Sequence, residues 1–137
     1  MAETITPRTR FEAVYSDFHK DLSPIPGRGD IARKLNENSV REAIKNLILT
    51  DKGERLFQPN LGSDIRASLF ENVTPTTIIL LKDKVREVLR AYEPRCNLLD
   101  VEVLGDIDEN AITVNVVFNV INSEAPQSIS IGIDRVR

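Results

Sequence analysis

The sequence lacks most of the residue types from which metal, redox and sugar-binding sites are built. Its 137 residues include one cysteine, Cys96, one histidine, His19, and no tryptophan. One cysteine excludes an internal disulfide, and two Cys or His residues cannot supply the four ligands of a closed structural zinc site. No apolar run is long enough to form a transmembrane helix. We therefore expect no metal, no cofactor and no membrane partner.

The sequence also has no large excess of charge of either sign, since it contains 18 basic and 21 acidic residues and its net charge is −3. This balance argues against nucleic acid as a partner, because phosphate-binding domains are strongly basic. The N-terminus has no apolar stretch typical of a signal peptide, so we expect a reducing cytoplasm or a particle assembled there. The length predicts a single domain over residues 14–137, preceded by a loose arm over residues 1–13.

The first predicted helix lies in the middle of the N-terminal half. Ser39 and Glu42 match the capping-box pattern, so the helix is expected to begin at Ser39 and to end before Gly53. The connection that follows is irregular, and Leu56 and Phe57 are expected to anchor it to the core. The apolar residues of the helix recur at helical spacing and form its buried stripe: Val40, Ala43, Ile44, Leu47 and Ile48.

Two more helices are predicted before the chain changes its period. Ser63 or Asp64 is expected to cap a short helix. A longer helix begins after Thr74, with proline in its first turn, and ends near Tyr92, because Pro94 excludes the residue before it from helical geometry. We expect Tyr92 to belong to the buried stripe of this helix.

After residue 95 the apolar residues alternate with polar ones. This period of two predicts antiparallel strands around residues 99–103, 112–120 and 128–133, with one buried face. Residues 13–18 predict a further short strand. Helices followed by strands indicate an α+β domain in which the helices pack on one face of a small antiparallel sheet, the C-terminal three-stranded meander.

The search for catalytic residues yields weak candidates only. Glu54, Glu71 and Glu93 lie near apolar residues and are the candidates for a glycosidase pair, in which one acid has a raised pKa. The alternative is that all three are solvated or salt-bridged. Cys96 with His19 is the candidate nucleophile and base, and the alternative is a small strand residue and a surface histidine. We predict a protein that is not an enzyme.

The most specific local feature is Glu93-Pro94-Arg95. Proline fixes its own φ and holds the preceding residue extended, so the carboxylate and the guanidinium are expected on one side of the chain, just beyond a helix. Arg binds a carboxylate through two parallel hydrogen bonds. Two interpretations stay open: an internal salt bridge that pins the junction of helix and strand, or a docking site for a partner.

The segment 128–136, which contains the last predicted strand, is poorly protected as a sheet edge. It contains no proline and is charged only at Asp134 and Arg135. Such an edge invites pairing with a strand of another chain, and the alternatives are an inner strand or an edge covered by the N-terminal arm. The candidates for strand pairing are Ser128, Ser130, Gly132 and Asp134.

Short motifs occur in a fixed order along the chain. They are Asn38-Ser39-Val40, Ala43-Ile44, Leu47-Ile48-Leu49-Thr50, Gly53-Glu54-Arg55-Leu56-Phe57-x-Pro59, Leu61-Gly62-Ser63, Leu69-Phe70-Glu71 and Tyr92-Glu93-Pro94-Arg95. The set resembles the GPW/gene-25-like baseplate wedge family of contractile-tailed phages, which includes a baseplate component of type VI secretion systems. The resemblance covers about residues 15–135.

The resemblance implies a structural role in the baseplate of a virion tail or tail-like particle, assembled in the host bacterial cytoplasm. It implies a fold similar to the sheath-subunit domain through which sheath rings interlock by strand exchange, and a platform for the first sheath ring. It associates Glu93, Pro94 and Arg95 with docking to the helical core bundle of the wedge. The other implied partners are the tail sheath subunit and tail tube or hub proteins.

Two further functions stay open at this point. Members of the family carry a lysozyme-like label, which makes a peptidoglycan hydrolase the alternative to a structural protein. Distant relatives of the fold act as small adaptors that bind a regulator, and fold analogy alone supports that function.

Overall fold

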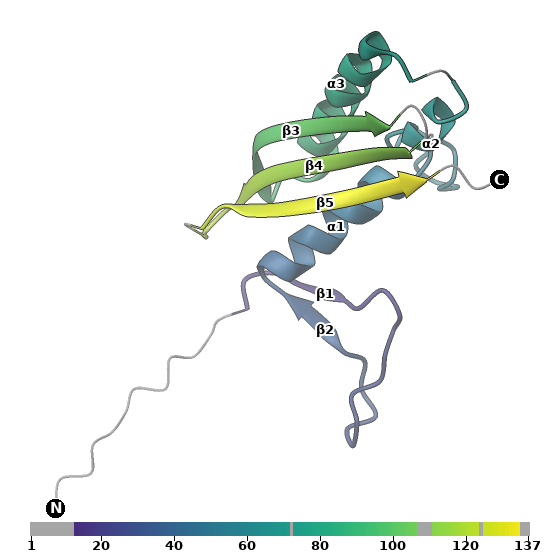
Figure 1. The fold of residues 1–137 in the computed structure, drawn as a ribbon. Coiled ribbons are helices and arrows are strands. Elements are labelled where there is room, and N and C mark those ends of the chain that lie inside the picture. Colours follow the sequence, from purple (N-terminus) through teal and green to yellow (C-terminus); the bar gives the residue numbers. More distant parts are fainter. Residues whose placement is uncertain (1–12, 72, 107–110, 124, 135–137) are drawn as a thin grey trace, which may run out of the picture.

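A three-stranded antiparallel sheet, with helices on one face, forms the body of the protein (Figure 1). The computed structural model describes residues 13–71, 73–106, 111–123 and 125–134. Nearly all of the expected arm over residues 1–13 lies outside the described residues, as does most of the expected turn over 106–110. The α+β class predicted from the order of helices and strands is confirmed.

The sheet is a meander whose strands follow one another in sequence and in space. Strands β3 (Cys96–Asp106), β4 (Ala111–Val120) and β5 (Gln127–Asp134) pair antiparallel in the order β3-β4-β5, as predicted. A β-bulge between Leu98 and Asp100 shifts the alternation of β3. Leu99 is the first apolar residue of the predicted strand 99–103 and was therefore expected on its buried face. It is half exposed instead, and that expectation is wrong.

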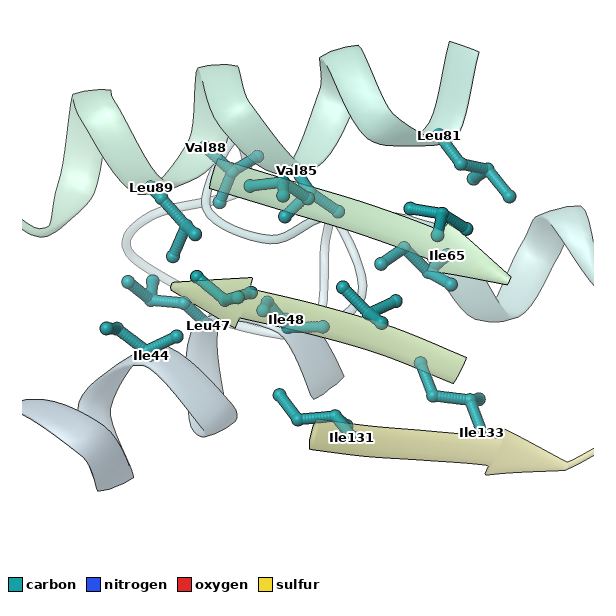
Figure 2. Close-up of a cluster of buried hydrophobic side chains, with 14 of the residues drawn as sticks. Ile44, Leu47, Ile48, Ile65, Leu81, Val85, Val88, Leu89, Ile131 and Ile133 are labelled. Carbon is teal, nitrogen blue, oxygen red and sulfur yellow. The ribbon is translucent and has the colours of Figure 1, made fainter. Parts of the chain in front are cut away.

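The core lies between the sheet and helices α1 (Glu37–Leu49) and α3 (Pro75–Tyr92). Figure 2 shows Ile44 of α1 and Leu89 of α3 pointing toward the strands, and Ile131 of β5 closing the cluster on the other side. Burying one such side chain contributes about 1.5–3 kcal/mol. The apolar residues that recur along the helices and the strands thus pack together in one layer. This packing holds the end of α3 next to the start of β3.

Helix α1 begins earlier than predicted, and the capping-box prediction is wrong. Ser39 lies inside the helix and is fully buried. Glu42 does not reach back toward Ser39, because its carboxylate accepts a hydrogen bond at 2.9 Å from the Lys34 ammonium. A tertiary ion pair replaces the local cap here. The N-cap residue is Asn36, with φ 49° and no side-chain cap hydrogen bond.

A two-stranded antiparallel hairpin precedes α1 and extends away from the main sheet (Figure 1). Its strands are β1 (Ser16–Phe18), inside the predicted strand 13–18, and β2 (Arg33–Leu35), which was not predicted. The Asn36 side-chain oxygen closes the hairpin by accepting hydrogen bonds from the backbone N–H groups of Val14 and Tyr15 at 3.0 and 3.3 Å.

The connection between α1 and α2 (Ile65–Ser68) turns away from the core. Helix α1 ends at Leu49, and Gly53 lies in the following turn at φ 84°. Gly62 has φ 133°, and a Cβ atom there would lie 2.5 Å from the Thr50 carbonyl oxygen. Leu56 and Phe57 are 91% and 98% exposed, so the prediction that they anchor this connection to the core is wrong.

Helix α3 has the bounds that the sequence predicts. The Thr74 hydroxyl caps it by accepting a hydrogen bond from the Thr77 backbone N–H at 3.2 Å. Tyr92, expected in the buried stripe, is 40% exposed instead. At the short helix α2, Asp64 makes no side-chain cap, and the Ser63 hydroxyl accepts from the backbone N–H that opens the helix at 3.4 Å.

Candidate functional site

The Glu93-Pro94-Arg95 corner is a β-turn that joins α3 to β3. The helix ends as the Glu93 backbone N–H donates to the Leu89 carbonyl at 3.0 Å, and the Cys96 N–H then donates to the Glu93 carbonyl at 3.4 Å. Pro94 occupies the second position of the turn, where its fixed φ is favourable. The extended run predicted for these three residues is therefore a turn, and Pro94 lies exposed at its tip.

The Glu93 carboxylate and the Arg95 guanidinium bind each other inside this turn. Arg95 Nε donates to Glu93 Oε1 and Nη2 donates to Oε2, both at 2.7 Å. The Glu93 side chain is 3% exposed and the Arg95 side chain 29%. Two parallel charge-assisted hydrogen bonds at these lengths are strong. The carboxylate raises the pKa of Arg95 above its ordinary value, chiefly by accepting these bonds.

Arg95 also connects the corner to three other parts of the fold. Its Nη1 lies 3.5 Å from the buried Ser39 hydroxyl of α1, and its guanidinium stacks over the Tyr15 ring at 5.8 Å from the ring centroid. Its carbonyl accepts a hydrogen bond from the Ile121 N–H, at the end of β4, at 2.9 Å. The internal salt bridge considered from the sequence is thus present, and it ties hairpin, helices and sheet together.

Sequence reasoning missed Ser39 and Tyr15 as partners of Arg95. Ser39 had another interpretation, as a helix cap, and Tyr15 lies in a segment without clear periodicity. The one available signal is a hydroxyl immediately before the apolar stripe of α1, where a buried polar side chain requires a partner.

Among the strands that the structure describes, β5 lies at an edge of the main sheet, and the inner-strand alternative does not hold for them. Within the described residues no strand pairs with its outer side, and whether the arm covers it lies outside them. Ile131 and Ile133 face the core, while the four candidate residues are on the solvent face: Ser128 and Ser130, Gly132, and Asp134. Apart from Asp134, this strand carries no charge.

The three candidate acids lie in different environments. Glu93 is occupied by Arg95, as described. The Glu54 carboxylate accepts a hydrogen bond at 3.0 Å from the Asp51 N–H, and the hollow that Glu54 lines contains no second carboxylate. Glu71 is exposed just beyond α2. A glycosidase requires two acids facing one substrate, and none of these contacts brings two of the three together.

The candidate nucleophile and base are each engaged elsewhere. The Cys96 thiol donates to the Glu93 carbonyl at 3.4 Å, and burial raises its pKa to about 11, with the nearby Glu93 charge as a second cause. The His19 ring instead accepts from the Asp21 N–H at 3.4 Å. A thiol kept protonated at neutral pH is a poor nucleophile.

Within residues 13–71, 73–106, 111–123 and 125–134, no three His, Cys, Asp or Glu side chains gather in a way that suits a metal ion. None of the helices in these ranges combines the length and apolar character required to cross a membrane.

Comparison with known proteins decides the family. The model of the family described as "Baseplate wedge protein gp25" matches residues 34–125. The chain belongs to this family. The baseplate wedge protein gp25 of Enterobacteria phage T4 is 33% identical over 110 residues, which cover 80% of this chain and 83% of the T4 protein. The matched range includes the Glu93-Pro94-Arg95 corner and all of β4.

Solved structures share the fold at lower identity. A putative tail lysozyme from Geobacter sulfurreducens superposes with a TM-score of 0.66 at 24% identity, covering 74% of this chain and 92% of that one. A chain of the type VI secretion system baseplate complex gives 0.62 at 18% identity, covering 72% and 93%. A chain of the anti-feeding prophage baseplate gives 0.62 at 19%, covering 86% and 83%. These likenesses confirm the wedge-family fold expected from the motifs.

Proposed function

We propose that this chain is a structural, non-enzymatic component of the baseplate wedge in a contractile tail or tail-like particle. It docks to the helical core bundle of the wedge through the Glu93-Pro94-Arg95 corner. It then offers the edge of β5 to the tail sheath subunit, as the platform for the first sheath ring. Tail tube or hub proteins are its further neighbours, and the host cytoplasm is the place of assembly. Membership of the wedge family carries this proposal.

The corner suits docking because its shape is set before a partner arrives. The ion pair and the turn hold Pro94 exposed at the tip, and the Arg95 side chain keeps 29% of its surface for a partner. Since Glu93 is already paired, docking requires no further desolvation of its carboxylate. A preformed surface of this kind loses little conformational entropy on binding.

The edge of β5 suits strand exchange because its backbone is accessible and its side chains do not oppose a neighbour. Serine and glycine occupy three of its solvent-facing positions, and Asp134 at its end carries its single charge. Each backbone hydrogen bond to an added strand contributes about 0.5–1.5 kcal/mol net. Several such bonds along one strand are sufficient to seat a sheath segment.

Pro94→Asp tests the docking role without removing the ion pair. We expect the variant to fold, with a stability loss below about 1 kcal/mol, and to be absent from wedges purified through another wedge protein when all particle components are co-expressed. Thr76→Asp, which adds the same charge at an exposed position at the far end of α3, is the matched control. Normal incorporation of Pro94→Asp would refute docking through the corner.

Gly132→Lys tests the strand-pairing role. A Cβ atom added at Gly132 would meet no atom within 4 Å, so the fold accommodates the side chain, while a lysine on an edge strand opposes pairing. We expect wedges to form and the fraction of sheathed particles in electron micrographs to fall. Thr113→Lys is the matched control, because it places the same charge on the same face of the sheet, directly opposite Gly132 on the central strand β4. Equal sheathing of Gly132→Lys and wild type would exclude this edge.

The alternative, peptidoglycan hydrolysis, has a direct assay. Purified protein is mixed with a cell-wall suspension and its turbidity followed, with Glu54→Gln and Glu93→Gln as controls. We expect no clearing, because the candidate acids do not converge on a common hollow. Clearing by wild type that either variant abolishes would overturn the structural assignment.

A further inference from the structure

The connection between α1 and α2 displays two large apolar side chains that the fold does not use. Leu56 and Phe57 are 91% and 98% exposed, the highest values among the large apolar residues described. The backbone that carries them is held in place: Gly53 N–H donates to the Pro59 carbonyl at 2.8 Å, and Ser63 N–H to the Thr50 carbonyl at 3.0 Å. Two apolar side chains held in solvent on an ordered loop are typical of a contact surface.

A cationic hollow of about 440 Å³ lies beside this loop. Lys20 from the hairpin loop, Arg55 from the connection and Arg66 from α2 line it, together with one acid, Glu54. The Glu54 carboxylate is engaged by a backbone N–H, at 3.0 Å. Among the described residues, none of the three cations forms a salt bridge. The lining therefore has a net charge of +2, in a chain whose net charge is −3.

We propose that the loop carrying Leu56 and Phe57, together with the hollow lined by Lys20, Arg55 and Arg66, docks an acidic segment of another protein chain that also bears apolar side chains. The carboxylates of that segment enter the hollow, and its apolar side chains cover Leu56 and Phe57. This surface is separate from the corner and from the edge of β5. The proposal does not depend on the proposed function, because it follows from the exposed groups alone.

A protein segment fits these groups better than a nucleic acid does. Three cations in one hollow neutralise a few carboxylates, whereas a phosphate backbone demands a longer basic track, which an acidic chain does not offer. The adjacent aliphatic Leu56 also has no role in contacts to phosphate or sugar. Charge complementarity and the apolar pair thus select the same occupant.

Fluorescence anisotropy with labelled peptides tests the proposal. The probe is a short peptide of alternating glutamate and leucine, and its controls replace either glutamate by lysine or leucine by serine. We expect the glutamate–leucine peptide to bind the full chain, with affinity that falls as salt is added. Both control peptides should bind at least tenfold more weakly.

Matched variants locate the binding on the protein. Phe57→Ser and Arg55→Glu should each weaken the glutamate–leucine peptide roughly tenfold, which corresponds to about 1.4 kcal/mol. Ile79→Ser and Arg90→Glu, which alter exposed residues of α3, should bind it as wild type does. Thermal melting checks that all four variants fold, since each change is at an exposed side chain.

Four results would overturn the proposal. The first three are equal binding of the lysine and glutamate peptides, wild-type affinity in both Phe57→Ser and Arg55→Glu, and absence of binding up to about 1 mM peptide. Tighter binding of a single-stranded oligonucleotide than of the glutamate–leucine peptide would likewise reject a protein segment as the occupant. None of these results bears on incorporation into wedges, so the two proposals are judged separately.

Discussion

Arg95→Ala measures how much the corner contributes to folding stability. The substitution leaves the Glu93 carboxylate, which is 3% exposed, without its two hydrogen bonds of 2.7 Å. Stranding one partner of a fully buried ion pair costs about 3–5 kcal/mol. Because Arg95 is itself 29% exposed, its removal opens the carboxylate to water. We therefore expect a smaller loss, about 2–3 kcal/mol in the free energy of unfolding.

Urea unfolding followed by far-ultraviolet circular dichroism measures this loss. Adding Glu93→Gln to Arg95→Ala removes the stranded charge, so the double variant should regain about 1–2 kcal/mol. Arg90→Ala, at an exposed arginine in the last turn of α3, is the control and should change stability by no more than about 0.5 kcal/mol. If Arg95→Ala is as stable as this control, or if Glu93→Gln gives no rescue, the ion pair does not pin the junction.

Three shorter predictions concern other parts of the fold. Alkylation of Cys96 by iodoacetamide at pH 8 should be roughly tenfold slower in the folded than in the urea-unfolded chain, and equal rates would contradict this. Raising the pKa of the thiol from 9.0 to about 11 lowers the thiolate fraction about a hundredfold, and the greater nucleophilicity of the more basic thiolate offsets roughly tenfold of that loss. The Lys34 hydrogen bond lowers the pKa of Glu42 below 4.5, so the stability from this pair, about 1 kcal/mol, is present above pH 4.5 and is lost as the pH falls through the lowered pKa. Glu42→Gln should therefore lower the unfolding free energy more at pH 7 than at pH 3, and an equal loss at both would refute the assignment. Gly62→Ala should cost about 2–3 kcal/mol in urea unfolding, since φ is 133° and the new Cβ would meet the Thr50 carbonyl; a loss below about 0.5 kcal/mol would show that the turn relaxes freely.

The elements that the sequence predicts well are those in which a periodic pattern continues over many residues and has a clear end. Helix α3 has the predicted bounds because Thr74 caps its first turn and Pro94 stops its continuation, and both effects are local. The meander is present because strict alternation leaves one way to bury an apolar face. In both cases the residues that decide the element lie within it.

The elements that the sequence predicts poorly depend on distant partners. Strand β2 has three residues, which are too few to show a period. Its hairpin is closed by the Asn36 side chain, whose partners Val14 and Tyr15 lie 22 and 21 positions earlier in the sequence. The capping box fails because Glu42 pairs with Lys34 of that hairpin. At the corner, the ion pair between Glu93 and Arg95 could be anticipated because the two residues are close in sequence. Ser39, however, lies 56 positions from Arg95, and no local pattern connects them.

The exposed Leu56 and Phe57 show a different kind of failure. Apolar residues in a loop are ordinarily assigned to the core, and that rule assumes that the folded chain is the final state of the molecule. A chain that works within an assembly also buries surface when it meets its neighbours. The same argument applies to β5, which carries a single charge, at its end: this is a liability in isolation and an advantage where a strand is added. Features that look inconsistent with a monomer are therefore where contacts between chains are to be sought, and here they fall on separate surfaces of the chain.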